Sequence, residues 1–165
     1  MKIILVCVAM SFTMMIYAQT EMDSMRKAMG IGNGKAHFTK PDGNFVALPD
    51  STGYTYPRWN AKIKGLLFAG NYQAVSKEFS KTKNSQERKV IARIHHSLKL
   101  KSAFTLIQEE IAPPESNSEN NILVTTVISN GHYTTFMVYG SYPKSHDKEL
   151  RKKFIQASLS IRVKE

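Results

Sequence analysis

Five histidines are the residues of this chain with the widest catalytic and metal-binding chemistry: His37, His95, His96, His132 and His146. No two of them are four residues apart, the spacing that places two imidazoles on one helix face around a metal ion. No nucleophile elbow, phosphate-binding glycine loop or dinucleotide fingerprint occurs in the chain. The sequence therefore nominates no catalytic residue, no metal site and no cofactor. A small hydrolase, using His37 or His132, would need a site assembled only by the fold.

Aromatic side chains provide a candidate ligand-binding site. Residues 49–60 have the composition of a loop and carry Tyr54, Tyr56, Arg58 and Trp59. Aromatic rings on a loop can stack on a sugar or another planar ligand, and they can equally cap one end of a hydrophobic core. The sequence leaves both interpretations open.

Basic side chains near the C-terminus provide a candidate partner-binding site, formed by Lys144, Lys148, Arg151, Lys152 and Lys153. The apolar stripe of Leu150, Phe154, Ala157 and Ile161 predicts a helix here, capped by Ser145, that packs against a sheet. This packing turns much of the charge toward water, with Arg151, Lys152 and Lys153 mostly outward. Such a helix can bind an acidic partner, and it can equally be a solvated surface with no partner.

The whole chain is basic, with 23 Lys and Arg against 13 Asp and Glu and a formal net charge of +10. A positive surface attracts anions in general. The chain lacks the known nucleic-acid-binding motifs, so we expect no nucleic acid partner. We expect instead an anionic component of the cell envelope or an acidic protein.

The N-terminus is typical of a cleavable bacterial secretory signal. Lys2 precedes an apolar stretch over residues 3–16, and Ala18 places a small residue before the expected cleavage point at Gln19. The stretch is shorter than the ~20 residues that a membrane-spanning helix needs. We therefore expect residues 1–18 to be removed, leaving a periplasmic or secreted protein with no transmembrane span. Its single cysteine, Cys7, would leave with the signal.

Residues 19–35 predict a methionine-rich helix followed by a glycine-rich linker, ahead of a single domain over residues 36–165. Met22, Met25 and Met29 share one helix face. Thioethers are soft ligands for copper(I), so a copper-binding module is an alternative function. Methionine at helical spacing is also ordinary packing material.

Two hairpins are predicted in the domain. The first spans residues 36–48 around a Pro-Asp-Gly turn. The second joins residues 122–129 to residues 132–139 through Asn130-Gly131, a two-residue turn that would pair Val127 with Thr134, Thr125 with Phe136, and Val124 with Met137. Both faces of the second hairpin are apolar, so we expect it to be covered on both sides.

The segments around this second hairpin complete the prediction. Residues 104–111 predict a further strand, and residues 115–121 an exposed loop. A helix is predicted after Asn84, with Glu87 completing a capping box and with the apolar stripe Val90, Ile91, Ile94 and Leu98. An internal echo supports two strand–turn–helix units, because Gly70-Asn71-Tyr72 is similar to Gly140-Ser141-Tyr142, and residues 94–100 are similar to residues 155–161.

The C-terminal third carries a family resemblance. The run from Tyr133 to Pro143, followed by a capped basic helix that ends in Ser158-Leu159-Ser160-Ile161, resembles the C-terminal end of PsbP-like proteins. The resemblance implies an α+β fold, an α/β/α sandwich built on an antiparallel sheet flanked by helices. It also implies an accessory or binding role rather than catalysis, and it carries over no catalytic residue. An exported accessory or binding protein is therefore the function expected first, with the hydrolase and the copper-binding module as alternatives.

Overall fold

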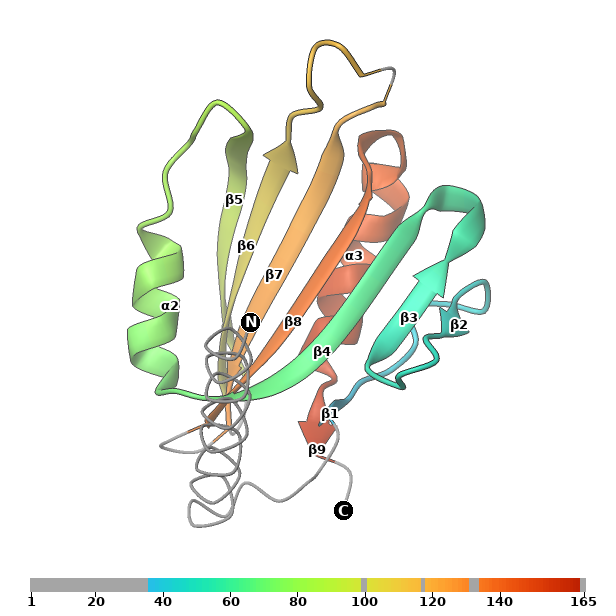
Figure 1. Ribbon diagram of the computed structural model, residues 1–165. Helices are drawn as coiled ribbons and strands as arrows, with labels where there is room; N and C mark the ends of the chain where they lie inside the picture. Colours follow the sequence, from blue (N-terminus) through green and yellow to red (C-terminus); the bar gives the residue numbers. More distant parts are fainter. Residues whose placement is uncertain (1–35, 99–100, 117, 131–133, 164–165) are drawn as a thin grey trace, which may run out of the picture. The chain divides into compact units, whose positions relative to one another are not determined.

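The computed structural model describes residues 36–98, 101–116, 118–130 and 134–163. Seven strands form one antiparallel sheet in the order β2-β3-β4-β8-β7-β6-β5 (Figure 1). They are β2 (Val46–Ala47), β3 (Gly53–Tyr56), β4 (Ala61–Ala69), β5 (Arg88–Ser97), β6 (Ser102–Glu110), β7 (Asn121–Ser129) and β8 (Thr134–Pro143). The expected signal and methionine helix lie outside the described residues.

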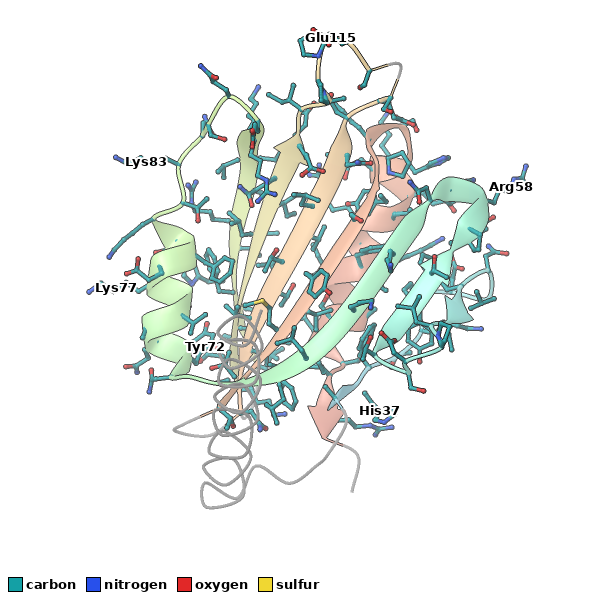
Figure 2. The ribbon with its side chains drawn as sticks, in the orientation of Figure 1. His37, Arg58, Tyr72, Lys77, Lys83 and Glu115 are labelled. Atoms are coloured by element: carbon teal, nitrogen blue, oxygen red, sulfur yellow. The ribbon has the colours of Figure 1, made fainter. Side chains whose placement is uncertain are left out.

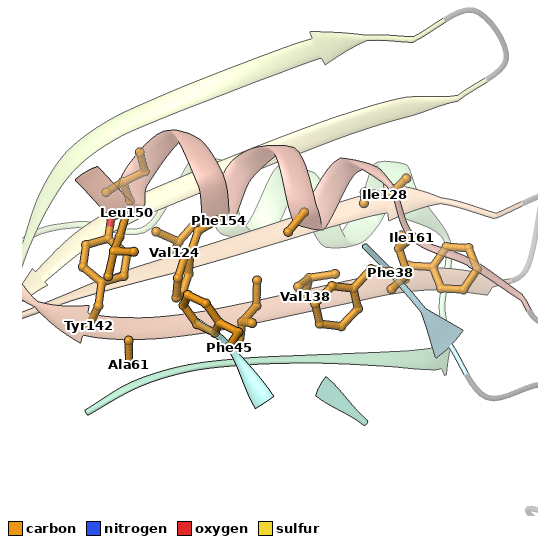
Figure 3. Close-up of a cluster of buried hydrophobic side chains, with 14 of the residues drawn as sticks. Phe38, Phe45, Ala61, Val124, Ile128, Val138, Tyr142, Leu150, Phe154 and Ile161 are labelled. Carbon is orange, nitrogen blue, oxygen red and sulfur yellow. The ribbon is translucent and has the colours of Figure 1, made fainter. Parts of the chain in front are cut away.

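Within the described residues, each face of the sheet carries one helix. On one face, α3 (Asp147–Leu159) buries Leu150, Phe154 and Ala157 in the main core, together with the inward residues of β4, β7 and β8 (Figure 3). On the other face, α2 (Tyr72–Ser80) packs over Phe104 and Leu106 of β6 and over β7. The predicted α+β fold is confirmed. The β7–β8 hairpin is covered on both sides only in part, because α2 covers Val127 and Met137 and leaves Tyr139 exposed. None of the helices described is long and apolar enough to cross a membrane.

The β7–β8 hairpin exists, but its predicted register is wrong by three residues. Val127 pairs with Met137 rather than with Thr134, because the chain turns through a longer connection than two residues. The Asn130 amide donates to the Thr134 carbonyl at 3.1 Å, and Ser129 pairs with Thr135. Side chains alternate along a strand, so an odd slip moves every β8 residue to the opposite face. Val138 and Phe136 therefore point into the α3 core and Met137 points toward α2.

The helix predicted after Asn84 is wrong, because residues 88–97 form the edge strand β5. Ala92, Ile94 and Leu98 pack toward the main core. A spacing of four residues matches a helix turn of 3.6 residues and also two periods of a strand, so the stripe from Ile94 to Leu98 could not separate the two. Asn84 caps no helix, and its side chain accepts a hydrogen bond from the Val90 amide at 2.8 Å.

The structure has a helix that the sequence analysis did not predict, α2, which follows β4 after two residues. Asn71 is its N-cap and accepts from the amides of Gln73 at 2.8 Å and Ala74 at 3.4 Å. The echo therefore holds for its strand–helix part, because β4 leads into α2 and β8 leads into α3. It fails further along, where residues 94–97 are strand and the corresponding residues of α3 are helix.

The predicted hairpin over residues 36–48 is also wrong. β1 (Ala36–His37) pairs with β9 (Arg162–Val163) near the other end of the chain, and β2 pairs with β3. The turn itself forms, with the Asn44 amide bound to the Asp42 carboxylate at 2.8 Å. The turn carries Phe45 into the core against Phe154, so its role is packing rather than joining two strands.

The final helix forms as predicted, with a different start. The turn η2 (Lys144–His146) precedes it, and His146 occupies the cap position without a side-chain cap. Ser145, the expected cap, bonds Glu119 instead through its amide and its hydroxyl, each at 3.0 Å. The exposed loop predicted over residues 115–121 therefore touches the start of α3.

Candidate functional site

The four residues of the aromatic candidate site do not lie on one loop. Tyr54 and Tyr56 are on β3, and Arg58 and Trp59 are in the short helix η1 (Pro57–Trp59) at the tip of the β3–β4 hairpin. Tyr54, Tyr56 and Trp59 are partly buried and pack against the main core. The Tyr54 hydroxyl donates to the Phe38 carbonyl at 3.2 Å. Three of the four side chains therefore hold this end of the core together, and Arg58 is exposed (Figure 2).

Trp59 connects the aromatic site to the basic one. Its indole stacks on the His146 imidazole with ring centroids 4.1 Å apart and an interplanar angle of 14°. Tyr56 lies against the same indole at 4.6 Å. His146 belongs to η2, directly before α3. The fold therefore joins the two candidate sites into one surface, through a histidine that sequence reasoning did not select because nothing local marks its contact with Trp59.

Three of the five basic side chains in the cluster are paired with acids, two of them with acids from other elements. Lys144 binds Glu109 at 2.7 Å, and Lys153 binds both Asp42 at 2.9 Å and Glu149 at 3.1 Å. Arg151 forms a two-pronged ion pair with Asp147, one turn earlier on α3. Arg151 and Lys153, which were expected to face mostly water, are only partly exposed, with 36% and 32% of their side chains accessible.

Asp147 is the centre of a network that anchors the start of α3. It accepts from Arg151 and from the hydroxyl of the fully buried Tyr142 at 3.0 Å. Burial and the Asp147 carboxylate raise the pKa of Tyr142. The hydrogen bond to Asp147 raises the pKa of Arg151. These side chains stabilise the helix–sheet contact rather than face a partner.

Two residues of the cluster remain available. Lys148 and Lys152 are exposed, one turn apart on α3, and neither forms an ion pair within the described part of the chain. They lie on the side of α3 opposite Leu150 and Phe154, because positions two residues on are turned by about 200° around a helix. The outward face of α3 therefore carries two cations with no acid bound to them in the described residues.

A hollow of about 220 Å³ lies between β1 and the β2–β3 hairpin, lined by His37, Ser51, Thr52 and Tyr54 among others. It brings a histidine near hydroxyls, as a hydrolase would need. The neighbouring carboxylate, Asp50, binds the Thr52 hydroxyl at 2.7 Å and Lys64 at 2.9 Å. Among the described residues, His37 forms no hydrogen bond to a hydroxyl or a carboxylate, the contacts that mark a catalytic triad, and the hydrolase alternative stays a prediction. His132 lies outside the described residues.

No group of three or more metal-ligating side chains is found in the described ranges. The methionines proposed for copper lie outside those ranges, so copper binding stays a prediction.

The fold is shared with solved structures of low sequence identity. LpqN from Mycobacterium tuberculosis, which is involved in cell envelope biogenesis, matches with a TM-score of 0.57 and 12% identity over 81% of this chain and 86% of LpqN. Cyanobacterial PsbP from Synechocystis sp. PCC 6803 matches with a TM-score of 0.48 and 12% identity over 82% of this chain and 96% of its own. The Ran-binding protein Mog1p from Saccharomyces cerevisiae matches with a TM-score of 0.48 and 12% identity over 79% of this chain and 95% of its own.

These comparisons describe the fold. The chain has the PsbP-like fold, and its structural likeness to LpqN covers 81% of the chain. Neither a family model nor a curated protein sequence matches the chain.

Proposed function

We propose that this protein is an exported accessory protein of the cell envelope that binds an anionic partner through the outward face of α3. The observation that carries the proposal is the pair of exposed lysines, Lys148 and Lys152, which no acid of the described residues binds, in a cluster whose other cations are paired. The involvement of LpqN, which shares the fold, in cell envelope biogenesis supports an envelope role.

The electrostatics of the helix favour an acidic or anionic partner. Like charges four residues apart on a helix repel each other by a few tenths of a kcal/mol, which an acidic partner removes. Arg58 lies at the tip of the β3–β4 hairpin and is joined to the start of α3 through the Trp59–His146 stack. A partner that spans both elements would meet three exposed cations: Arg58, Lys148 and Lys152.

The test compares two double variants that make the same change in net charge. Lys148→Glu with Lys152→Glu reverses the proposed surface, and Lys77→Glu with Lys83→Glu reverses two exposed lysines of α2 and the loop after it. The measurement is cosedimentation of each purified protein with isolated cell envelopes over a salt series around 0.1 M, where the Debye length is ~10 Å. We expect the α3 variant to lose at least about tenfold in association and the control to keep it.

Equal losses in both variants would show that net charge alone governs association, and no loss in either would show that α3 is only surface. Circular dichroism checks that both variants remain folded. Neither pair touches the Asp147 network, so no loss of folding is expected.

A further inference from the structure

The sheet face that carries α2 is only partly covered by it. Tyr72, Val75 and Phe79 of α2 pack over Phe104, Leu106 and Val127, which belong to β6 and β7. In the strand order, β3 and β4 lie toward the edge formed by β2, whereas β5 forms the other edge of the sheet (Figure 1). On this face, α2 reaches Met137 of β8 but forms no extensive contact with β2, β3 or β4 within the described residues.

Exposed apolar side chains gather on this part of the face. Leu66 pairs with Met137, which contacts the α2 cluster, so Leu66 points to the same side as α2. Tyr139 is two residues after Met137 and points the same way. Of the large hydrophobic residues, five are exposed in the described ranges, and three of them are on this face: Val46 at 52%, Leu66 at 39% and Tyr139 at 44%.

Two lysines lie among these apolar residues. Lys64 pairs with Tyr139 across the strands, and Lys62 pairs with Ser141. Thr55 pairs with Lys62 and also with Val46, which brings Val46 onto the same face. We call Val46, Lys62, Lys64, Leu66 and Tyr139 the β4–β8 patch. The patch combines exposed apolar side chains with positive charge. Exposed apolar side chains that gather in one place are typical of an interaction site.

We propose that the β4–β8 patch binds an amphipathic helix of a partner protein that carries acidic residues beside its apolar stripe. The patch lies on the opposite side of the sheet from α3, so it is a second surface beyond the proposed function.

The geometry favours a helix over an extended peptide or a membrane. β4 is hydrogen-bonded to β3 on one side and β8 on the other, so no edge is free here for an added strand. α2 rises above the sheet by about 10 Å, the diameter of a helix, so a flat lipid surface would meet α2 before the patch. Leu66 and Tyr139 are diagonal neighbours, about 7 Å apart, close to the 5–6 Å between residues four apart on a helix.

The charges favour an acidic helix. Lys64 already binds Asp50, which is its neighbour on the β2–β3 loop. Lys62 is exposed and has no ion pair within the described residues. A glutamate or aspartate beside the apolar stripe of the incoming helix would pair with Lys62 while leucine-like side chains cover Leu66 and Tyr139.

The experiment uses two synthetic helical peptides of about 18 residues, long enough to form a helix on binding. Both have leucine at i, i+3, i+4 and i+7 spacing, and one carries glutamate where the other carries lysine. Binding to the purified protein is measured by fluorescence anisotropy, and backbone amide shifts in NMR spectra locate the site. We expect the glutamate peptide to bind and to shift the amides of β4 and β8.

Substitutions on the surface then identify the patch. Leu66→Asp with Tyr139→Ser should weaken binding at least about tenfold, the loss expected when two apolar anchors of an interface are removed. Lys62→Glu should transfer the preference to the lysine peptide. The matched control is Ile91→Ser with Ile111→Ser, which removes the other two exposed hydrophobics and should leave binding unchanged.

Several outcomes would overturn the proposal. Equal binding of both peptides would show that the partner need not be acidic. Unchanged binding by the Leu66→Asp, Tyr139→Ser variant would show that the β4–β8 patch is not the binding site. Phosphatidylglycerol vesicles that shift the β4 amides when the glutamate peptide does not would show a lipid surface instead. The Lys148→Glu, Lys152→Glu variant should bind the peptide normally, so failure of the α3 proposal leaves this result intact.

Discussion

Gly140 allows α3 to lie directly on β8. A side chain at this position would place its first carbon 2.5 Å from two carbons of the Phe154 ring. Phe154 also meets Tyr142 at 4.8 Å and Phe45 at 5.8 Å between ring centroids (Figure 3). The ring is therefore held on three sides and has little room to move, which makes the missing side chain of Gly140 a requirement of the core.

Gly140→Ala should therefore destabilise the domain by about 1–3 kcal/mol, the usual cost of overpacking a core. Chemical denaturation with urea measures the free energy of unfolding. The matched control is Gly43→Ala, where the added carbon meets no atom within 4 Å and little change is expected. Equal stability of the two variants would show that Phe154 moves aside freely.

Tyr142 makes the stability of the domain sensitive to alkaline pH. Its pKa is raised in the folded protein by burial and by the Asp147 carboxylate, above the value of about 10 in an unfolded chain. The folded state therefore holds this proton more tightly, and the resulting stability is present below pH ~10 and is lost as pH rises above it.

Tyr142→Phe tests this dependence. The variant should lose about 1 kcal/mol at neutral pH with the hydrogen bond to Asp147. Above pH ~10 its stability should fall less steeply than that of the parent, because the group that must ionise is gone. Parallel curves of unfolding free energy against pH would show that Tyr142 does not cause the alkaline loss.

At the scale of elements, the two faces of the β7–β8 hairpin depend on its register. Thr125 and Tyr139 are direct neighbours in the structure, whereas the two-residue turn expected from Asn130-Gly131 would pair Thr125 with Phe136. The longer connection brings Phe136 and Val138 under α3. The gain from burying these two apolar side chains exceeds the small preference of a turn sequence.

Paired cysteines distinguish the two registers. Thr125→Cys with Tyr139→Cys should form a disulfide, because cross-strand neighbours have Cα atoms within the 4.4–6.8 Å that a disulfide spans. Thr125→Cys with Phe136→Cys should not, because the structure puts these residues on opposite faces and about 10 Å apart along the strands. The disulfide is detected by electrophoresis without reducing agent, on protein that lacks Cys7. A disulfide in the Thr125→Cys, Phe136→Cys variant alone would show that the strands are joined by the two-residue turn.

At the scale of the whole molecule, contacts between distant segments close the domain. β1 pairs with β9, and the ion pair of Lys153 with Asp42 joins residues 111 positions apart. Residues near both ends of the domain therefore meet around α3, where the proposed binding surface lies.

Export is a prediction about the whole chain. Mass spectrometry of the protein isolated from its native host should find Gln19, free or cyclised, as the N-terminus, because the cleavage pattern ends at Ala18. The control is the same chain with Ala18→Leu, whose bulky residue should block cleavage. An intact Met1 in the envelope fraction of cells that express the parent would contradict the prediction.

Local patterns in the chain were sufficient to predict the strands β6, β7 and β8 and the helix α3, and the family resemblance implied the antiparallel α+β class. The stripe of Leu150, Phe154 and Ala157 marked the buried side of α3 correctly, because a helix face is defined by residues three and four apart. The same rule could have found α2, where Tyr72, Val75 and Phe79 follow the cap at Asn71.

Only the tertiary structure decided which segments meet. A strand pattern defines a face but not a partner, so the pairing of β1 with β9 and the register of β8 against β7 could not be predicted locally. The candidate site changed for the same reason. Acids distant in sequence neutralise Lys144 and Lys153, and Trp59 is brought onto His146, which leaves Lys148 and Lys152 as the cations of α3 that are available to a partner.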